Sequence, residues 1–181
     1  MDAAQDLFFA QQALSTLFSV ANKLQIQGDK YLQDLTIRQM LAIPAIFHAP
    51  EGKATINHIA RTLGTTKQSA KQIVEAMEKK GYLSTAPSKR DKRAVDVSIT
   101  PEGERVFSAC SERTDEFMAD IFQDFTTEDL ANLCTLLEKL YQFDGAKQAS
   151  IQEHINDRAN KNDDVLEYHQ NYIKRRTRNR E

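Results

Sequence analysis

Apolar residues recur at every third or fourth position near the start of the chain, which predicts an amphipathic helix over about residues 5–27. Phe8, Phe9 and Phe18 widen the apolar surface of this helix. The stripe itself consists of Leu7, Ala10, Leu14, Leu17, Ala21 and Leu24. A stripe this apolar has to be buried, either inside its own domain or against a second subunit.

Two more helices with apolar stripes are predicted in the second half of the chain. Thr100 and Pro101 mark the start of the first, because threonine caps a helix and proline suits its first position. Its stripe is Phe107, Cys110, Thr114, Phe117 and Ile121. Thr126 and Asp129 predict the cap of the second, whose stripe is Leu130, Leu133, Leu137 and Leu140. After about residue 144 the chain is polar, and apolar residues spaced over 151–155 and 165–172 indicate further helical stretches.

A shorter helix is predicted to begin at Thr36. Thr36 and Gln39 have the spacing of a capping box, in which each side chain satisfies a free backbone N–H at the helix start. Pro44 lies inside this segment and predicts a kink or an early end near Ile43, since proline removes one donor and clashes with the preceding turn. A turn over residues 49–52 closes the element.

The next two helices have the spacing of a helix-turn-helix. Thr55 predicts the cap of a short helix from Ile56 to Thr62, and Gly64 breaks it. Thr65 and Gln68 then predict a second capping box, which opens a helix to about Lys80 that Gly81 closes in the left-handed conformation. The inward-facing residues of the pair are Ile59, Ala60, Leu63, Ala70, Ile73, Val74 and Met77. Two helices joined by a short glycine-containing turn are typical of DNA-binding domains.

After Gly81 the apolar period changes from helical to alternating, which predicts a β-hairpin. One strand covers about residues 82–86 and the other about residues 94–99, with a polar and strongly basic loop over residues 87–93 between them. We interpret the hairpin as a wing. The predicted fold class is therefore mainly α with a small β-hairpin, arranged as a winged helix-turn-helix lobe with additional helices.

Charge is distributed unevenly along a chain of 181 residues whose net charge is only −2. Residues 53–93 contain ten Lys or Arg and three acidic residues, residues 94–173 carry a net charge of −11, and residues 174–181 carry +4. A basic middle segment inside an acidic protein indicates attraction to a polyanion.

The remaining composition argues against several other classes of protein. The chain has no apolar run long enough to span a membrane, and its acidic N-terminus does not resemble a signal peptide. Two cysteines do not form a disulfide framework, and we expect both Cys110 and Cys134 to be small buried hydrophobic residues with reduced thiols rather than oxidant sensors. The four histidines have no metal-ligand spacing, and we find no catalytic motif, so we expect no cofactor, no metal and no enzymatic activity.

Taken in order, these elements resemble the MarR family of bacterial transcription regulators over about residues 5–143. The most specific part of the resemblance runs from Lys79 through the Asp-x-Arg of the wing to residues 100–103. The matching residues are Leu35, Thr36, Gln39, Ile59, Ala60, Leu63, Thr66, Lys67, Ile73, Met77 to Leu83, Ser88 to Arg93 and Ile99 to Gly103. Pro44 and about 35 residues beyond the usual end depart from the family pattern.

The resemblance implies a homodimer whose N- and C-terminal helices intertwine and whose two winged lobes read a palindrome. We accordingly expect a helical dimerisation region from residues 1–34 and 101–148, a DNA-binding domain over residues 35–100, and a polar and basic extension over residues 149–181. Many members respond to a ligand or an oxidant. A small-molecule effector would bind where the first, second and fifth helices meet, although the sequence identifies no residue of that pocket.

The start of the second helix of the helix-turn-helix is predicted to read the major groove, because its first turns present donors and acceptors to base edges. Gln68 or Gln72 could pair with adenine, and Lys67 or Lys71 could reach guanine or a phosphate. The predicted contact residues on this helix are Thr65, Thr66, Lys67, Gln68, Ser69, Lys71 and Gln72.

The wing is predicted to contact DNA through Ser88, Lys89, Arg90, Asp91, Lys92 and Arg93. Arginine suits the narrow minor groove, whereas Asp91 would repel DNA and is expected to pair with Arg93 or Arg90 and stiffen the loop. The basic end, residues 174–180, either adds nonspecific phosphate contacts or serves only to keep the protein soluble.

These features predict a sequence-specific DNA-binding transcription regulator of the cytoplasm, with double-stranded DNA and a second copy of the chain as partners. The expected form is a ligand- or stress-responsive repressor that binds a palindromic operator. The alternative is a winged-helix module that docks another protein without specific DNA binding. The basic helix and wing favour DNA, because a protein-docking surface does not require concentrated positive charge.

Overall fold

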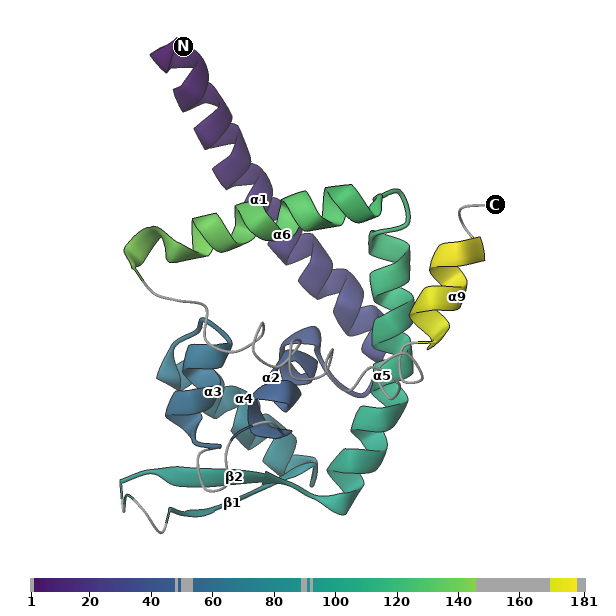
Figure 1. Cartoon of the computed structure of the whole chain (residues 1–181). Helices are drawn as coiled ribbons and strands as arrows, with labels where there is room; N and C mark the ends of the chain where they lie inside the picture. The colour runs from purple at the N-terminus through teal and green to yellow at the C-terminus, as the bar shows by residue number, and fades with distance from the viewer. Residues whose placement is uncertain are drawn as a thin grey trace.

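The computed structural model describes residues 2–47, 49, 54–88, 91, 93–145 and 170–178. Its helices are α1 (Ala3–Leu32), α2 (Ile37–Phe47), α3 (Ile56–Thr62), α4 (Lys67–Lys79), α5 (Pro101–Ile121), α6 (Thr127–Tyr141), the short 3-10 helix η1 (Gln142–Asp144) and α9 (Gln170–Arg178). Strands β1 (Leu83–Pro87) and β2 (Val95–Ile99) form the hairpin. The chain is thus mainly α with one β-hairpin, as predicted. The N-terminal part of α1 extends away from the winged lobe, and α6 runs across α1 in the view of Figure 1.

The hydrophobic core lies between α2, α3, α4 and the hairpin. The end of α1 and the first half of α5 complete it with Leu32, Phe107 and Cys110. The inward face predicted for the helix-turn-helix is confirmed, since Ile59, Ala60, Ala70, Val74 and Met77 are buried and Leu63 and Ile73 pack partly buried against them. This packing holds the two helices in a fixed relative position.

The turn between α3 and α4 differs by one residue from the prediction. The short helix begins and ends as predicted, and the Thr55 hydroxyl accepts a hydrogen bond from the His58 N–H. Gly64 adopts the left-handed φ of 59°, which explains the glycine. The capping residue of α4 is Thr66 rather than Thr65, because Thr66 has the extended backbone that a cap needs while the Thr65 N–H closes the turn onto the Ala60 carbonyl.

Helix α4 ends as its sequence predicts. Gly81 has φ 79°, and the N–H groups of Gly81 and Tyr82 donate to the carbonyls of Glu78 and Met77. This pattern is the Schellman motif, which satisfies the last carbonyls of a helix and turns the chain sharply. The chain therefore enters β1 directly from α4, the predicted recognition helix.

Of the two outcomes predicted at Pro44, a kink or an early end near Ile43, the early end is wrong, because the helix continues through Pro44 to Phe47. A proline inside a helix costs about 3 kcal/mol. Ile43 and Ile46 are buried on the same helix, and each buried isoleucine contributes about 1.5–3 kcal/mol. The free energy gained by burying the two isoleucines therefore offsets the cost of the proline in the helix. The capping box of Thr36 and Gln39 at the helix start is confirmed by both of its hydrogen bonds. The predicted turn over residues 49–52 lies mostly outside the described residues.

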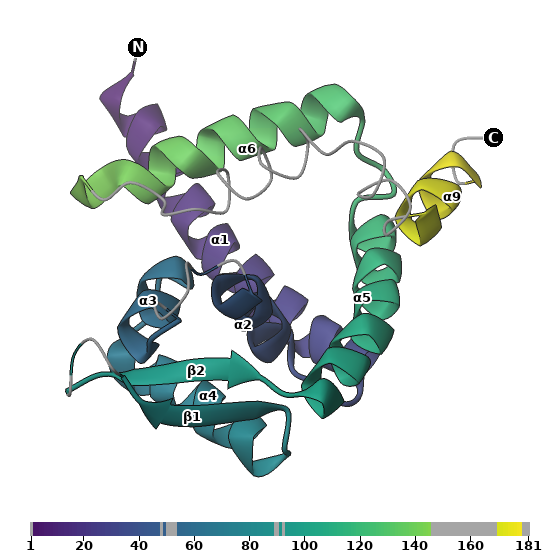
Figure 2. The same cartoon turned by 60° about the horizontal axis from the view of Figure 1, so that its bottom comes forward.

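The hairpin is antiparallel, with Leu83 opposite Ile99 and Pro87 opposite Val95. Strand β1 starts one residue later than predicted and includes Pro87. Proline has no backbone N–H to donate, and it is tolerated at an edge position where that hydrogen bond is not needed. Strand β2 is anchored to the start of α3, since Asp96 forms a β-bridge with Thr55 and the Val97 N–H donates to the Ala54 carbonyl. Figure 2 shows the hairpin lying across α4.

Gly103 marks a close approach between α5 and the end of the recognition helix. A Cβ atom added at this position would lie 2.1 Å from the carbonyl oxygen of Tyr82. Thr100 caps α5 through the Gly103 N–H and also donates its hydroxyl to the Gly81 carbonyl. The threonine and the glycine together fix α5 against the turn that leaves α4.

Helices α1 and α6 carry apolar residues that the single chain leaves exposed. Helix α1 is longer than predicted and displays Leu7, Phe8, Phe9, Leu14 and Phe18, while α6 displays Leu136, Leu137 and Leu140. The cap that Thr126 and Asp129 predict is confirmed as a full capping box. No helix within the described residues is long and apolar enough to cross a membrane.

Candidate nucleic-acid interface

The first two turns of α4 form an exposed polar surface. Among the residues predicted there, Thr66, Lys67, Gln68, Lys71 and Gln72 are exposed, and Thr65 and Ser69 are half-buried. Two cationic and two amide side chains thus face solvent at the end of the helix that would enter a groove. Ammonium and amide groups are the donors and acceptors that read base edges and phosphates.

Thr66 and Ser69 have a local structural role at the start of α4. The Thr66 hydroxyl accepts a hydrogen bond from the Ser69 N–H over 3.1 Å and donates one to the Ser69 hydroxyl over 3.2 Å. These contacts fix the first turn of the helix. The lysine and glutamine side chains that follow therefore project from a rigid element.

Glu78 connects the recognition helix to the hairpin. One of its carboxylate oxygens accepts hydrogen bonds from the Thr85 N–H over 3.0 Å and from the Thr85 hydroxyl over 2.6 Å. Hydrogen bonds to a carboxylate are among the stronger ones in proteins. The wing and α4 consequently keep a fixed relative position.

The tip of the wing presents Arg93, whose side chain is 93% exposed. Its guanidinium pairs with the Asp91 carboxylate over 3.3 Å, and the same oxygen accepts the Arg93 backbone N–H over 2.9 Å. The predicted pairing of Asp91 with Arg93 is thus confirmed, and it shapes the loop. Lys89, Arg90 and Lys92 lie outside the described residues.

Ser88 does not present its side chain as predicted. It is only 5% exposed, and its backbone N–H donates to the Ala94 carbonyl over 3.0 Å, which closes the base of the wing loop. Its position in the polar loop suggested exposure, but the ladder of the hairpin continues one residue further than the strand pattern indicates. We assign Ser88 to the structure of the wing rather than to its contact surface.

Arg38 is a candidate contact residue that the sequence analysis missed. It lies on the first turn of α2, is exposed, and donates a hydrogen bond to the Thr65 hydroxyl over 3.2 Å. A third cation therefore stands beside the start of the recognition helix. No local pattern could have identified it, because the two residues are 27 positions apart in the chain.

Two cations of the basic segment are engaged within the protein. Lys80 donates a hydrogen bond to the Asp34 carbonyl over 2.6 Å and lies over the Tyr82 ring. Lys71 pairs with Glu75 over 3.4 Å, although both side chains are exposed. The net charge of the segment therefore overstates the charge that the interface offers.

A pocket of about 330 Å³ lies between the start of α3, α4 and the wing. Its lining combines the cationic Lys67, Lys71 and Arg93, the acidic Glu75 and Glu78, and the apolar Ile56, Val74 and Val95. This place differs from the junction of the first, second and fifth helices, where the sequence analysis expected an effector. Among the described residues, no group of histidine, cysteine and acidic side chains is arranged to hold a metal ion.

The two cysteines differ in their surroundings. Cys110 is buried as expected, and desolvation by burial raises the pKa of its thiol. Cys134 is exposed in the chain, so the expectation that it is buried is wrong. The stripe on α6 that suggested its burial is itself exposed in the single chain.

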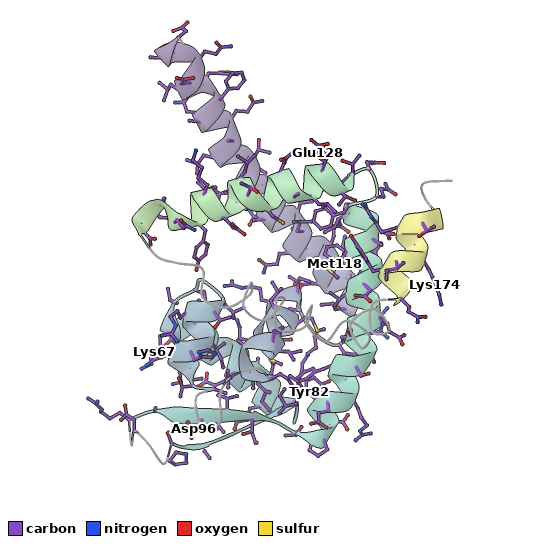
Figure 3. The ribbon with its side chains drawn as sticks, viewed as in Figure 1. Lys67, Tyr82, Asp96, Met118, Glu128 and Lys174 are labelled. Atoms are coloured by element: carbon purple, nitrogen blue, oxygen red, sulfur yellow. The ribbon has the colours of Figure 1, made fainter. Side chains whose placement is uncertain are left out.

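Part of the basic end of the chain is held within the fold, which neither of its two predicted roles anticipated, and both roles stay predictions for the rest of it. Residues 174–178 belong to α9, which packs against α5 on the side of the molecule opposite Lys67 (Figure 3). Arg175 pairs with Glu116 and Asp120, and Arg176 is almost fully buried. At least these two arginines are engaged within the protein rather than available to DNA phosphates.

Residues 33–94 match the pattern described as the MarR family. The transcriptional activatory protein BadR of Rhodopseudomonas palustris is 24% identical over 144 residues, which cover 77% of this chain and 79% of BadR. The uncharacterized HTH-type regulator YsmB of Bacillus subtilis is 26% identical over 89 residues, covering 49% of this chain and 61% of YsmB, less than two thirds of that relative.

Solved structures share the fold of this chain. The S. aureus MepR–DNA complex superposes with a TM-score of 0.63 at 20% identity, covering 71% of this chain and 96% of MepR. A cysteine-to-serine mutant of E. coli MarR bound to operator DNA superposes with a TM-score of 0.62 at 20% identity, covering 77% of this chain and 99% of MarR. Each matched chain is covered almost completely, while about a quarter of this chain lies outside the match.

Proposed function

We propose that this chain, whose residues 33–94 match the MarR family pattern, regulates transcription by binding a specific DNA sequence through α4 and the wing. The first two turns of α4 support this function most directly, since Lys67, Gln68, Lys71 and Gln72 are exposed there on a helix whose other face is buried in the core. The helix would lie in the major groove, with Arg93 and the wing over the adjacent minor groove.

The exposed apolar faces of α1 and α6 support a homodimer. Phe18 is 66% exposed and Leu136 is 64% exposed, and neither face has a partner element within the described chain large enough to cover it. Large contiguous apolar surfaces on a single subunit usually mark interfaces. A second copy of the chain would cover these faces and carry two winged lobes related by a two-fold axis, which matches a palindromic operator.

Leu136→Glu tests the dimer. Placing a carboxylate in the proposed interface should weaken self-association by about tenfold or more, as measured by sedimentation velocity. Thr135→Glu is the matched control, because it adds the same charge at the neighbouring exposed position of α6. Equal self-association of both variants and the wild type would contradict the assignment of α6 to the interface.

Selection from a randomised duplex library tests the DNA-binding function. Duplexes recovered by the full-length protein should share two inverted half-sites, and a Gln68→Ala or Gln72→Ala variant should lose discrimination at a defined base pair. Recovery of unrelated sequences, with equal affinity for all of them, would instead favour the protein-docking module.

We further propose that the chain acts in the cytoplasm as a repressor that a small molecule releases from DNA. The pocket between α4 and the wing supports this, because a bound anion would neutralise Lys67, Lys71 and Arg93, which the DNA would otherwise engage. Deleting the gene should raise transcription from the promoter beside the selected site. A fall would identify an activator instead, which is the role named for BadR.

A further inference from the structure

Helix α9 lies along the second half of α5, far from the wing (Figures 1 and 2). Arg176 is its most deeply buried described residue, with only 9% of its surface exposed. Burying an arginine is unfavourable unless its donors are satisfied. The contacts of this side chain therefore show what holds α9 in place.

The guanidinium of Arg176 joins the two ends of the turn between α5 and α6. One of its nitrogens donates to the carbonyl of Phe122, the C-cap of α5, and another donates to the carbonyl of Phe125 over 2.6 Å. Phe125 immediately precedes Thr126, the cap of α6. The same turn is closed by the Phe125 N–H on the Phe122 carbonyl and by the two phenylalanine rings, whose centroids lie 5.4 Å apart.

A positive charge is favourable at this place because the carbonyls at the end of a helix carry partial negative charge. Only arginine presents several donors in a fixed planar fork, so that one side chain can hold two separate carbonyls. The neighbouring ion pairs of α9 contribute less to holding this helix in place. Arg175 pairs with Glu116 over 3.3 Å and Asp120 over 3.4 Å, but these groups are partly exposed, and such pairs contribute little.

Helix α6 is held mainly near its two ends. None of its residues is fully buried, so packing along its length holds it weakly. Its start is held at the turn that Arg176 bridges. At its other end, the Tyr141 ring lies near Gly64, at a distance of 3.5 Å between the Tyr141 hydroxyl and a Cβ built on that glycine.

We propose that Arg176 is a positioning residue that fixes the angle at which α6 leaves α5. With the proposed function, on which this consequence rests, α6 forms part of the dimer interface. The angle therefore sets the separation of the two winged lobes and hence the half-site spacing that the dimer prefers in DNA. The C-terminal helix would thus take part in DNA specificity without touching DNA.

Hydrogen–deuterium exchange of the full-length protein tests the positioning role directly. Arg176→Gln should accelerate exchange of the amides around Phe122 to Asp129 by about tenfold or more, because both carbonyl contacts are lost. Arg176→Lys should give an intermediate result, since it keeps the charge but not the fork. Lys174→Gln is the matched control on the same helix, where an exposed cation is removed, and it should exchange like the wild type.

Binding to duplexes with altered half-site spacing tests the consequence for DNA. Starting from a selected operator, the spacing between half-sites is changed by one or two base pairs, which rotates and displaces one half-site relative to the other. Wild type and Lys174→Gln should bind the altered duplexes about tenfold or more weakly. Arg176→Gln should lose most of this preference while retaining the same selected half-site sequence.

Wild-type exchange at the turn in Arg176→Gln would overturn the positioning role, whatever its DNA binding. Faster exchange with an unchanged spacing preference would overturn the link to half-site spacing. If the wild type binds a scrambled duplex as tightly as the selected operator, the proposed function fails, and the exchange comparison alone then decides whether Arg176 holds the turn.

Discussion

Lys80 donates a hydrogen bond to the backbone carbonyl of Asp34 over 2.6 Å and so ties the end of the recognition helix to the corner between α1 and α2. Arg113 of α5 reaches the same corner, with hydrogen bonds to the Leu32 carbonyl over 3.0 Å and to the Asp34 carboxylate over 3.2 Å. Gln33, which lies between Leu32 and Asp34 in the chain, has φ 58°, a conformation that non-glycine residues rarely adopt. The two cations hold this corner and connect the long helix α1 to α4.

Lys80 and Lys67 should therefore respond differently to the loss of charge. Lys80→Met removes a structural hydrogen bond and should lower the free energy of unfolding by about 1 kcal/mol, without changing the salt dependence of DNA affinity. Lys67→Met should leave stability unchanged and reduce the slope of log affinity against log salt by about one, because one phosphate contact is lost. Chemical denaturation measures the change in stability, and binding titrations at several salt concentrations measure the change in salt dependence. A loss of stability in Lys67→Met together with a reduced salt slope in Lys80→Met would contradict the roles given to both lysines.

Arg93→Ala should weaken DNA binding strongly with little loss of stability, because this side chain is exposed and its ion pair is with Asp91 of the same loop. Loss of an arginine from the minor groove should cost about tenfold or more in affinity. Lys174→Ala, a cation on the opposite side of the protein, is the control and should bind normally (Figure 3). Unchanged affinity of Arg93→Ala would remove the wing from the interface.

Gly103→Ala should destabilise the fold by about 2 kcal/mol or more. The added methyl group would lie 2.1 Å from the Tyr82 carbonyl oxygen, so α5 or the turn after α4 would have to move. Glu102→Ala changes an exposed neighbour in the same turn and serves as the control. Thermal unfolding compares the two variants. Equal melting temperatures would show that α5 leaves enough room beside the Tyr82 carbonyl for a methyl group.

Cys110 should be protected from thiol reagents in the folded protein. It is buried, burial raises the pKa of its thiol, and the thiolate that reacts is therefore disfavoured. In a Cys134→Ser variant, which leaves Cys110 as the single thiol, a disulfide reagent at about pH 8, near the ordinary thiol pKa, should react only as fast as the protein unfolds. Rapid reaction of the native variant would instead reopen the possibility that Cys110 senses oxidants.

The sequence predicted most accurately those features that depend on neighbouring residues. The bounds of α3, the caps at Thr36, Thr55, Thr100 and Thr126, and the end of α4 at Gly81 follow from spacings of a few positions, and all were confirmed. The continuation of α2 past Pro44 was not predictable in this way, since it depends on how deeply Ile43 and Ile46 are buried.

Contacts between distant parts of the chain limited the prediction of the site. The exposed residues of α4 could be named from the helix-turn-helix pattern, but the proximity of Arg38 to Thr65 could not. For the same reason Lys80 and Arg176 looked like surface cations, whereas both bind backbone carbonyls of other elements. Charge counted along a sequence cannot distinguish a cation facing solvent from one used inside the fold.

The binding of specific DNA by this chain is tested most directly with the intergenic DNA beside its own gene. The affinity of the purified full-length protein is measured at two salt concentrations and compared with that for a scrambled duplex of equal composition. Tight binding that prefers the native duplex and weakens steeply with salt is the predicted result. Absence of binding to either duplex at low salt would contradict the assignment of α4 and the wing as a DNA-binding surface.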